Sequence, residues 1–342
     1  MLAAFFSWLE RQGDPFPDER PEKPPASLFG FIVHYARPFW PLLTVNAFLE
    51  ALIAILEVSL FAFVGNLVNW LETAEPVGFF DSHQSILIIM AVLVLIILPL
   101  LNFVNEAIIH QGLLGNFAMR TRWQAHRYLL RQSLGFFQND FAGRLAAKMM
   151  QTALGVRETV MKTTSILVYV SVYFTASVVL FAASDLRLSA PLILWLAGYL
   201  LTLRYFVPKL GALSKQQSEA RSALTGRVVD SYTNIGTVKM FADAEYEDAY
   251  ARQGMDKLLD NVHRQMRLVT ILTVTLNILN GLVLFSVAGA SVWLWQLSAV
   301  QTGAIAFSIG LVLRMQGMAH WIMWEVTGLF ENIGVVQDGI ET

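Results

Sequence analysis

Six apolar runs, each long enough to cross a lipid bilayer, dominate this sequence. They lie at 41–71, 85–112, 165–184, 188–207, 268–296 and 303–330. Since an α-helix rises about 1.5 Å per residue, about 20 apolar residues cross the hydrocarbon layer. Several runs are longer, so we expect their helices to project beyond the bilayer. The runs predict an all-α membrane protein with six long transmembrane helices.

The composition agrees with a multi-pass membrane protein. Hydrophobic residues make up 55% of the 342 residues and charged residues only 15%, whereas soluble domains carry about 25% charged residues. The chain has no cysteine, so disulfide and thiol chemistry are excluded. This composition fits a bacterial inner (plasma) membrane protein.

The basic residues predict the orientation of the chain. Of the 24 lysines and arginines, 22 lie in residues 1–40, 113–164 and 204–267, while the connections at 72–84 and 297–302 contain none. Positive charge favours the cytoplasmic side of a membrane. We therefore expect both termini and both long connections, 113–164 and 208–267, to be cytoplasmic.

Residues 1–40 divide into three parts before the first span. Residues 1–9 are too short to span a membrane, but Phe5, Phe6 and Trp8 suit an interface anchor. Residues 13–27 are rich in proline and charge, which is typical of an extended linker. We expect a tail and linker at 1–27, an elbow helix lying on the membrane at 28–40, and a six-span domain at 41–342.

The second long connection contains an amphipathic segment at 226–250. Apolar residues occur in steps of three and four, which places them on one stripe of a helix; they are Val228, Tyr232, Ile235, Val238 and Phe241. Periodicity alone leaves open whether this helix docks onto a partner, lies on lipid, or is a solvated connector.

The residue order within this segment resembles the second coupling segment of ABC exporter membrane domains. That family pattern is acidic-x-x-x-Gly-Ile-x-x-Val-Lys-x-Phe, and here Asp230, Ile235, Lys239 and Phe241 match it. Asn234 replaces the usual glycine, a mild change because asparagine tolerates left-handed backbone.

A second resemblance occurs in the first long connection. The family has an aromatic pair, a short polar stretch and Gly-x-Leu after its first coupling helix. This chain has Phe136 and Phe137, followed by Gly143-Arg144-Leu145. The usual Ser-Arg that follows is Ala147-Lys148, which keeps only the positive charge. A turn with Gly143 as a helix terminus is the simpler explanation, but a second matching motif favours the resemblance.

The resemblance implies the membrane domain of a half-size exporter. In that family two six-span halves assemble and exchange spans 4 and 5, and their coupling helices contact ATP-binding domains. The partners implied are a second copy or a homologous half, an ATP-binding domain in cis or in trans, and membrane lipids. The contact residues implied are Phe136, Phe137, Tyr232, Asn234, Ile235, Lys239 and Phe241.

The ATP-binding domain itself is absent from these 342 residues. They contain no Gly-x-x-x-x-Gly-Lys-Ser/Thr phosphate loop and no Gly-Lys pair. ATP and Mg²⁺ are therefore implied only for a domain outside this sequence, and ATP hydrolysis is an activity of the family rather than of this chain. We expect the chain to be the membrane half of a longer polypeptide.

Other chemistry finds no support in the sequence. The six histidines are scattered without a His-x-x-x-His pair, so no metal site is predicted. No nucleophile motif accompanies the serine, histidine and aspartate residues, so no catalytic residue is predicted. The basic residues orient the helices, and we expect no nucleic-acid binding.

Polar residues within the spans are candidates for a substrate cavity, because ionisable groups at this depth usually face a bundle interior or a water-filled space. The candidates are Glu50, Glu57, Asn102, Glu106, His110, Arg314, His320 and Glu325. Interhelical hydrogen bonds or snorkelling side chains are the alternative explanation. Glu57 and Arg314 lie at matching depth, counted from the predicted outer ends of spans 1 and 6, and could pair.

Two functions remain open from the sequence. The first is the transmembrane domain of an ATP-driven exporter of an amphiphilic or small organic substrate. The second is an ATP-independent, proton-driven transporter with the same fold, in which Glu50, Glu57 or Glu106 carries the proton. A purely structural scaffold explains neither coupling motif.

Overall fold

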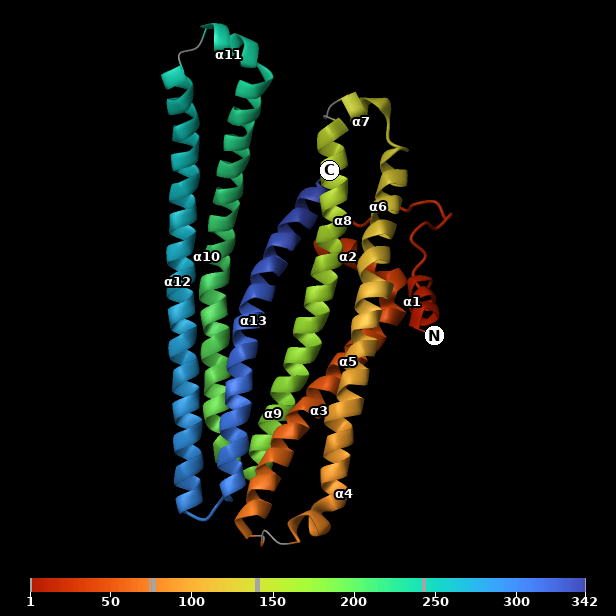
Figure 1. Ribbon diagram of the computed structural model, residues 1–342. Helices are drawn as coiled ribbons and strands as arrows, with labels where there is room; N and C mark the ends of the chain where they lie inside the picture. Colours follow the sequence, from red (N-terminus) through yellow and green to blue (C-terminus); the bar gives the residue numbers. More distant parts are fainter. Residues whose placement is uncertain (1, 74, 76–77, 139–141, 242–243, 342) are drawn as a thin grey trace. The chain divides into compact units, whose positions relative to one another are not determined.

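The computed structural model describes residues 2–73, 75, 78–138, 142–241 and 244–341 (Figure 1). The chain forms two compact units, one of Met1–Ala190 with Ser286–Thr342 and one of Pro191–Phe285. The described residues are almost entirely helical and contain no strand.

Six helices of the described chain are long and apolar enough to cross a membrane. They are Leu28–Thr73, Phe79–Leu129, Leu145–Ser184, Leu186–Thr233, Glu245–Gln296 and Thr302–Ile340. The prediction of an all-α fold with six transmembrane helices is confirmed. Each predicted span lies inside one of these helices, and most of the helices are far longer than a bilayer requires.

The first unit holds spans 1–3, span 6, and one helical excursion. Its elements are α1 (Leu2–Glu10), α2 (Leu28–Ala36), η1 (Arg37–Phe39), α3 (Trp40–Thr73), α4 (Phe79–Val92), η2 (Leu93–Ile97), α5 (Leu98–Ala107), η3 (Ile108–Leu114), α6 (Gly115–Leu129), α7 (Leu134–Gln138), α8 (Ala142–Ser165), η4 (Ile166–Val170), α9 (Ser171–Ser184) and α13 (Thr302–Ile340). Figure 1 shows the short α7 at the turn between α6 and α8. The elements η2, η3 and η4 are π-helical turns within longer helices.

Local chemistry sets several of the helix ends. The Ser27 hydroxyl accepts a hydrogen bond from the Gly30 amide at 3.3 Å and caps the start of α2. Asp185 adopts an extended backbone that ends α9. Its carboxylate accepts hydrogen bonds from the Arg187 amide and guanidinium, both at 2.8 Å, and these bonds lower the pKa of Asp185.

The core of the first unit lies where α2, α3, η3, α6, α8 and α13 meet. Phe39 and Phe117 stack there with ring centroids 4.8 Å apart, and both are almost fully buried. The most apolar stretch of span 6 is 50% buried, compared with 11% for span 2. α13 is therefore the central helix of this unit, and span 2 leaves most of its apolar surface uncovered.

The start of α13 packs very closely on α3. A β-carbon at Gly303 would lie 1.9 Å from the Gly65 carbonyl oxygen, so only glycine fits at this position. The Asn69 side chain accepts the Gly303 amide hydrogen bond at 2.7 Å. This contact fixes spans 1 and 6 against each other near the Thr73 end of α3.

The second unit is a hairpin made from most of α10 (Leu186–Thr233) and α12 (Ala244–Gln296), with α11 (Ile235–Phe241) at its turn (Figure 1). Trp195 donates its indole hydrogen to Asn280 at 3.0 Å, a buried interhelical bond. Further along, Ser231 donates to Glu247 at 3.1 Å. Pro191 and Pro208 lie inside α10 without ending it, as membrane helices allow.

Candidate functional site

Three spans of the first unit bring one carboxylate, one phenol and one guanidinium together. Glu57 comes from α3, Tyr169 from η4 and Arg314 from α13. An Arg314 guanidinium nitrogen lies 3.0 Å from Glu57 Oε2, and the Tyr169 hydroxyl donates to the same oxygen at 2.8 Å. Arg314 also contacts the Tyr169 hydroxyl at 3.3 Å. Glu57 and Arg314 therefore form the pair that their matching depth suggested.

The surroundings of this cluster are aromatic and only partly closed. The Tyr169 ring lies edge-on to Trp321. The ring of Tyr173, which is fully buried, packs against the Tyr169 ring with centroids 5.8 Å apart. The exposed fraction of the side chain is 26% for Glu57 and 49% for Arg314. Arginine stays charged and the pair is neutral overall, so the cluster can offer its cation to an incoming anionic group.

A large cavity lies further along the same helices, towards the Thr73 end of α3. Its volume is about 1010 Å³, and α3, α9, the end of α12 and the start of α13 line it. None of its lining residues is charged; amide and hydroxyl groups of Asn66, Asn69, Ser184 and Gln301 face it beside Trp295. Ala62, in its wall, follows Glu57 by little more than one helical turn.

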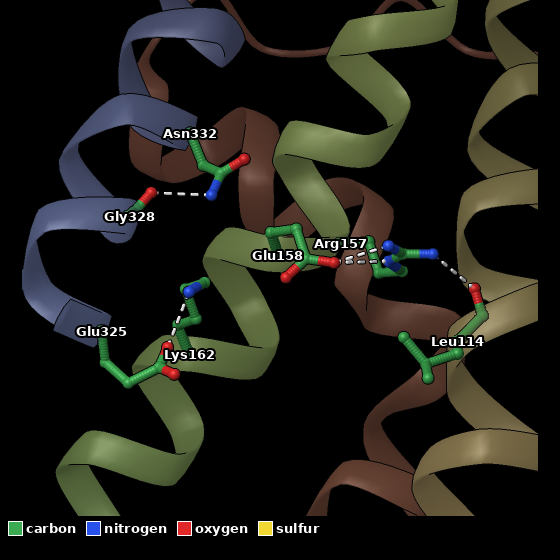
Figure 2. Close-up of polar contacts among 7 residues, drawn as sticks. All are labelled: Leu114, Arg157, Glu158, Lys162, Glu325, Gly328 and Asn332. Carbon is green, nitrogen blue, oxygen red and sulfur yellow. Dashed lines mark hydrogen bonds and ion pairs between the residues drawn. The ribbon is translucent and has the colours of Figure 1, made fainter. Parts of the chain in front are cut away.

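A second ion pair joins α8 to α13 (Figure 2). Lys162 Nζ lies 2.7 Å from Glu325 Oε2, and both side chains are about three-quarters buried. A β-carbon at Gly328 would lie 2.9 Å from Lys162 Nζ, so this glycine makes room for the ammonium group. Figure 2 also shows Arg157 of α8, which pairs with Glu158 and donates to the Leu114 carbonyl oxygen at 3.0 Å.

Glu50 is the most buried of the predicted acidic residues. Its exposed fraction is 8%, and the Ser165 hydroxyl donates to Oε1 at 2.9 Å. Its other carboxylate oxygen, Oε2, is buried without a hydrogen-bond partner among the described residues. One turn earlier on α3, the Asn46 side chain donates to Asn105 at 2.7 Å. This network joins spans 1, 2 and 3.

Three predicted cavity residues do not belong to these clusters. Asn102 donates to the Leu98 carbonyl oxygen of its own helix at 2.9 Å. Glu106 and His110 contact each other at 3.5 Å on one helix face, and both are more than half exposed. The side chain of His320 lies outside those that the structure describes.

The residues predicted to contact an ATP-binding domain lie at the tips of the two excursions, each described within its own unit. In the first unit, Phe136 and Phe137 form an edge-to-face pair in α7. In the second unit, Tyr232 is 71% exposed and Ile235 is 44% exposed, Lys239 is exposed, and Asn234 donates to the carboxylate and the backbone oxygen of Asp230. Residues 139–141 and the side chains of Arg144 and Phe241 lie outside those that the structure describes.

Sequence reasoning missed Tyr169, Lys162 and Ser165, each of which contacts a predicted carboxylate. Tyr169 carried no signal, because a tyrosine in an apolar span is ordinary. In the sequence, Lys162 is one of the many basic residues that predict the orientation of the helices, and nothing there links it to Glu325. No group of histidine, aspartate or glutamate that could hold a metal ion occurs among the described residues, and no phosphate loop that would hold ATP occurs in the sequence.

The fold and these clusters define a multi-pass membrane protein with two long helical excursions and a charged cluster between its spans. Comparison with known proteins makes the class definite. Residues 40–316 match the model of the ABC transporter transmembrane region. The chain therefore belongs to that family.

The chain is also similar to particular proteins. It is 41% identical, over all 342 residues, to an "Uncharacterized ABC transporter ATP-binding protein" of Haemophilus influenzae, and it spans 56% of that protein's length. It covers 54% of the solved structure of a bacterial Atm1-family ABC exporter with ATP bound, with a TM-score of 0.69 over 88% of this chain and 15% identity. The second likeness shows the fold, which is that of an ABC exporter transmembrane domain.

Proposed function

We propose that this chain is the transmembrane domain of an ATP-driven exporter that moves an amphiphilic or small organic substrate across a bacterial inner membrane. The observation that carries the proposal is the cluster of Glu57, Tyr169 and Arg314, with a large uncharged cavity further along the same helices. A molecule with one charged group and a larger neutral part matches both surfaces. Its anionic group would displace the Glu57 carboxylate from Arg314.

Energy for transport would come from an ATP-binding domain in cis or in trans, with ATP and Mg²⁺ as its cofactors. Two facts support this: the H. influenzae relative is named an ATP-binding protein, and this chain spans 56% of it. Exposed apolar side chains at the tip of the second excursion, among them Tyr232, suit a protein partner.

The assembly we propose has two copies related by an axis along the membrane normal. Both termini and both excursions lie in the cytoplasm, as the distribution of basic residues favours. The tail at 1–27, the elbow at 28–40 and the six-span domain at 41–342 are the proposed divisions. Closure of the ATP-binding domains would move the excursions as rigid levers and change access to the cluster.

A proton-driven transporter with the same fold remains a second candidate, and one observation favours it. Glu50 is a buried carboxyl group with no cation within ion-pair distance among the described residues. A lone carboxylate at this depth is costly, so a bound proton would stabilise it. Dependence of transport on ATP, rather than on a proton gradient, separates the two candidates.

The decisive experiment uses the full-length protein in proteoliposomes. We expect uptake of amphiphilic organic anions that requires Mg-ATP and persists when an ionophore collapses the proton gradient. Uptake driven by a pH gradient without ATP would support the second candidate instead.

Tyr232→Ala tests the coupling role in the same system. We expect ATP binding to stay intact while hydrolysis no longer drives transport, because the variant removes an exposed ring at the excursion tip. Tyr246→Phe, at an exposed position of α12, is the matched control and should transport normally. Unchanged transport by Tyr232→Ala would refute this role.

A further inference from the structure

The N-terminal strap, which we define as residues 10–19, lies along α6 and is held there by side chains of that helix. Asn116 donates to the Glu10 carbonyl oxygen at 2.6 Å, and Arg120 donates to that of Asp14 at 2.7 Å. Trp123 donates to the Pro17 carbonyl oxygen at 3.1 Å. All of the acceptors are backbone carbonyl groups.

Arg127 completes this series of donors. Its guanidinium donates to the Pro17 carbonyl oxygen at 2.7 Å, to that of Glu19 at 2.9 Å and to that of Asp18 at 3.1 Å. The four donor residues follow one another at steps of four, three and four. This spacing places them on one face of a helix, so α6 presents a continuous row of donors to an extended peptide.

The strap has features that suit this kind of binding. Pro15 and Pro17 favour an extended backbone and lack amide hydrogens that would need partners. Phe16 lies edge-on to Trp123 with ring centroids 5.6 Å apart, and the Arg127 guanidinium lies over the same indole. Gly13 and Pro17 are buried, whereas the acidic side chains of Asp14 and Asp18 point outward.

The segment before the strap, α1, contacts the neighbouring turns of the same span. α1 packs against η3, with Leu9 almost fully buried. The Phe5 and Phe6 rings lie about 6 Å from the ring of Phe103 in α5. Consequently α1 contacts α5, which precedes the π-helical turn η3, and the strap contacts α6, which follows it. Such wide turns interrupt regular helix geometry and occur frequently at functional sites.

We propose that α6 carries a peptide-binding face whose ligand is the chain's own N-terminal strap, and that its occupation braces span 2 across η3. Recognition is through backbone carbonyl groups, so the ligand class is an extended, proline-containing peptide. Because the strap is covalently attached, its effective concentration is high and the face is occupied in the intact chain.

Residues 23–26, which follow the strap, contact a further part of the first unit. Together with α2, α6, α8 and the end of α13 they enclose a cavity of about 330 Å³. Release of the strap would therefore loosen both the packing around η3 and the packing around the C-terminal turn of α13. The binding proposal does not depend on the proposed substrate or energy source.

The test uses the full-length protein with residues 2–24 deleted and a fluorescent synthetic peptide of residues 2–24 added in trans. We expect the peptide to bind with micromolar affinity and to raise the melting temperature of the truncated protein. Trp123→Phe, which keeps an aromatic ring but loses the indole donor, and Arg127→Gln should each weaken binding about tenfold. Arg131→Gln is the matched control and should leave binding unchanged, because Arg131 lies just beyond the end of α6 and its guanidinium donates to the Arg127 carbonyl oxygen rather than to the strap.

If the truncated protein does not fold, the intact chain provides a second measurement. The chain has no cysteine, so Pro17→Cys introduces a single buried thiol. Its labelling by a maleimide should be about tenfold faster when Arg120→Gln and Arg127→Gln are added, and unchanged by Arg131→Gln. A folded truncated protein that binds no peptide, or equal labelling in all variants, would overturn the proposal.

Discussion

Two acidic–basic pairs within the spans of the first unit have similar sequence signals and very different surroundings. Glu57 and Arg314 come from α3 and α13, lie 3.0 Å apart and share the Tyr169 hydroxyl. Glu106 and His110 belong to one stretch of span 2, lie 3.5 Å apart, and are 58% and 56% exposed. The first pair joins two spans, and the second remains on the surface of one.

The difference shows that depth along a span does not determine which side a residue faces. Asn105, beside Glu106 in the chain, is buried and accepts a hydrogen bond from Asn46 of α3. On a helix, neighbouring residues direct their side chains about 100° apart around the axis. Glu106 and the residue one turn later, His110, are more than half exposed, although their polarity made them equal candidates.

The largest effect that would test this comparison is expected from Arg314→Ala. The variant removes the cation that we propose to bind the substrate, and transport should fall about tenfold or more. Glu57→Gln should impair transport less, and the double variant should be no worse than Arg314→Ala alone. ATP-dependent uptake into inverted vesicles measures all three. Full activity of Arg314→Ala would remove the cluster from the pathway.

Lys162→Met should have the largest effect on stability. It leaves Glu325 mostly buried without its cation, which we expect to cost about 2–4 kcal/mol, because breaking a buried pair leaves an uncompensated charge. Adding Glu325→Gln should recover part of that loss. Unfolding of the detergent-solubilised protein measures both, and the idea fails if the single variant is as stable as the double one.

Tyr169→Phe should have a smaller effect. It removes the hydroxyl that donates to Glu57 at 2.8 Å while keeping the ring against Trp321. Hydrogen bonds to charged groups contribute about 1.5–3 kcal/mol, and partial exposure of the Glu57 side chain places the loss near the lower end. Thermal unfolding checks the value, and an increase in stability would contradict it.

Glu106→Gln should have the smallest effect. An exposed pair four residues apart on one helix contributes about 0.2–0.5 kcal/mol. We expect stability and transport close to the wild type in the assays used for Arg314→Ala. A large loss of transport in Glu106→Gln would show that the pair faces a partner or the pathway, and the contrast between the two pairs would disappear.

The membrane fold was predictable because its signals are local. Apolar length predicts six helices, and in the structure the predicted spans lie within six such helices. The break between the apolar runs at 165–184 and 188–207 contains Asp185, and in the structure this residue ends α9. Residues 1–27 were less predictable, because the strap is held by donors about 106–110 residues further along the chain.

The class of protein and the number of spans follow from composition and from the lengths of the apolar runs, and the rise of a helix predicts how deep each charged residue lies. The sequence leaves open which side chains meet, and the tertiary structure shows that Glu57 meets Arg314 and Tyr169, that Lys162 meets Glu325, and that Glu106 is exposed. The physical reason is that a helix fixes spacing along its axis, whereas the rotation of each helix about that axis is set by packing against its neighbours.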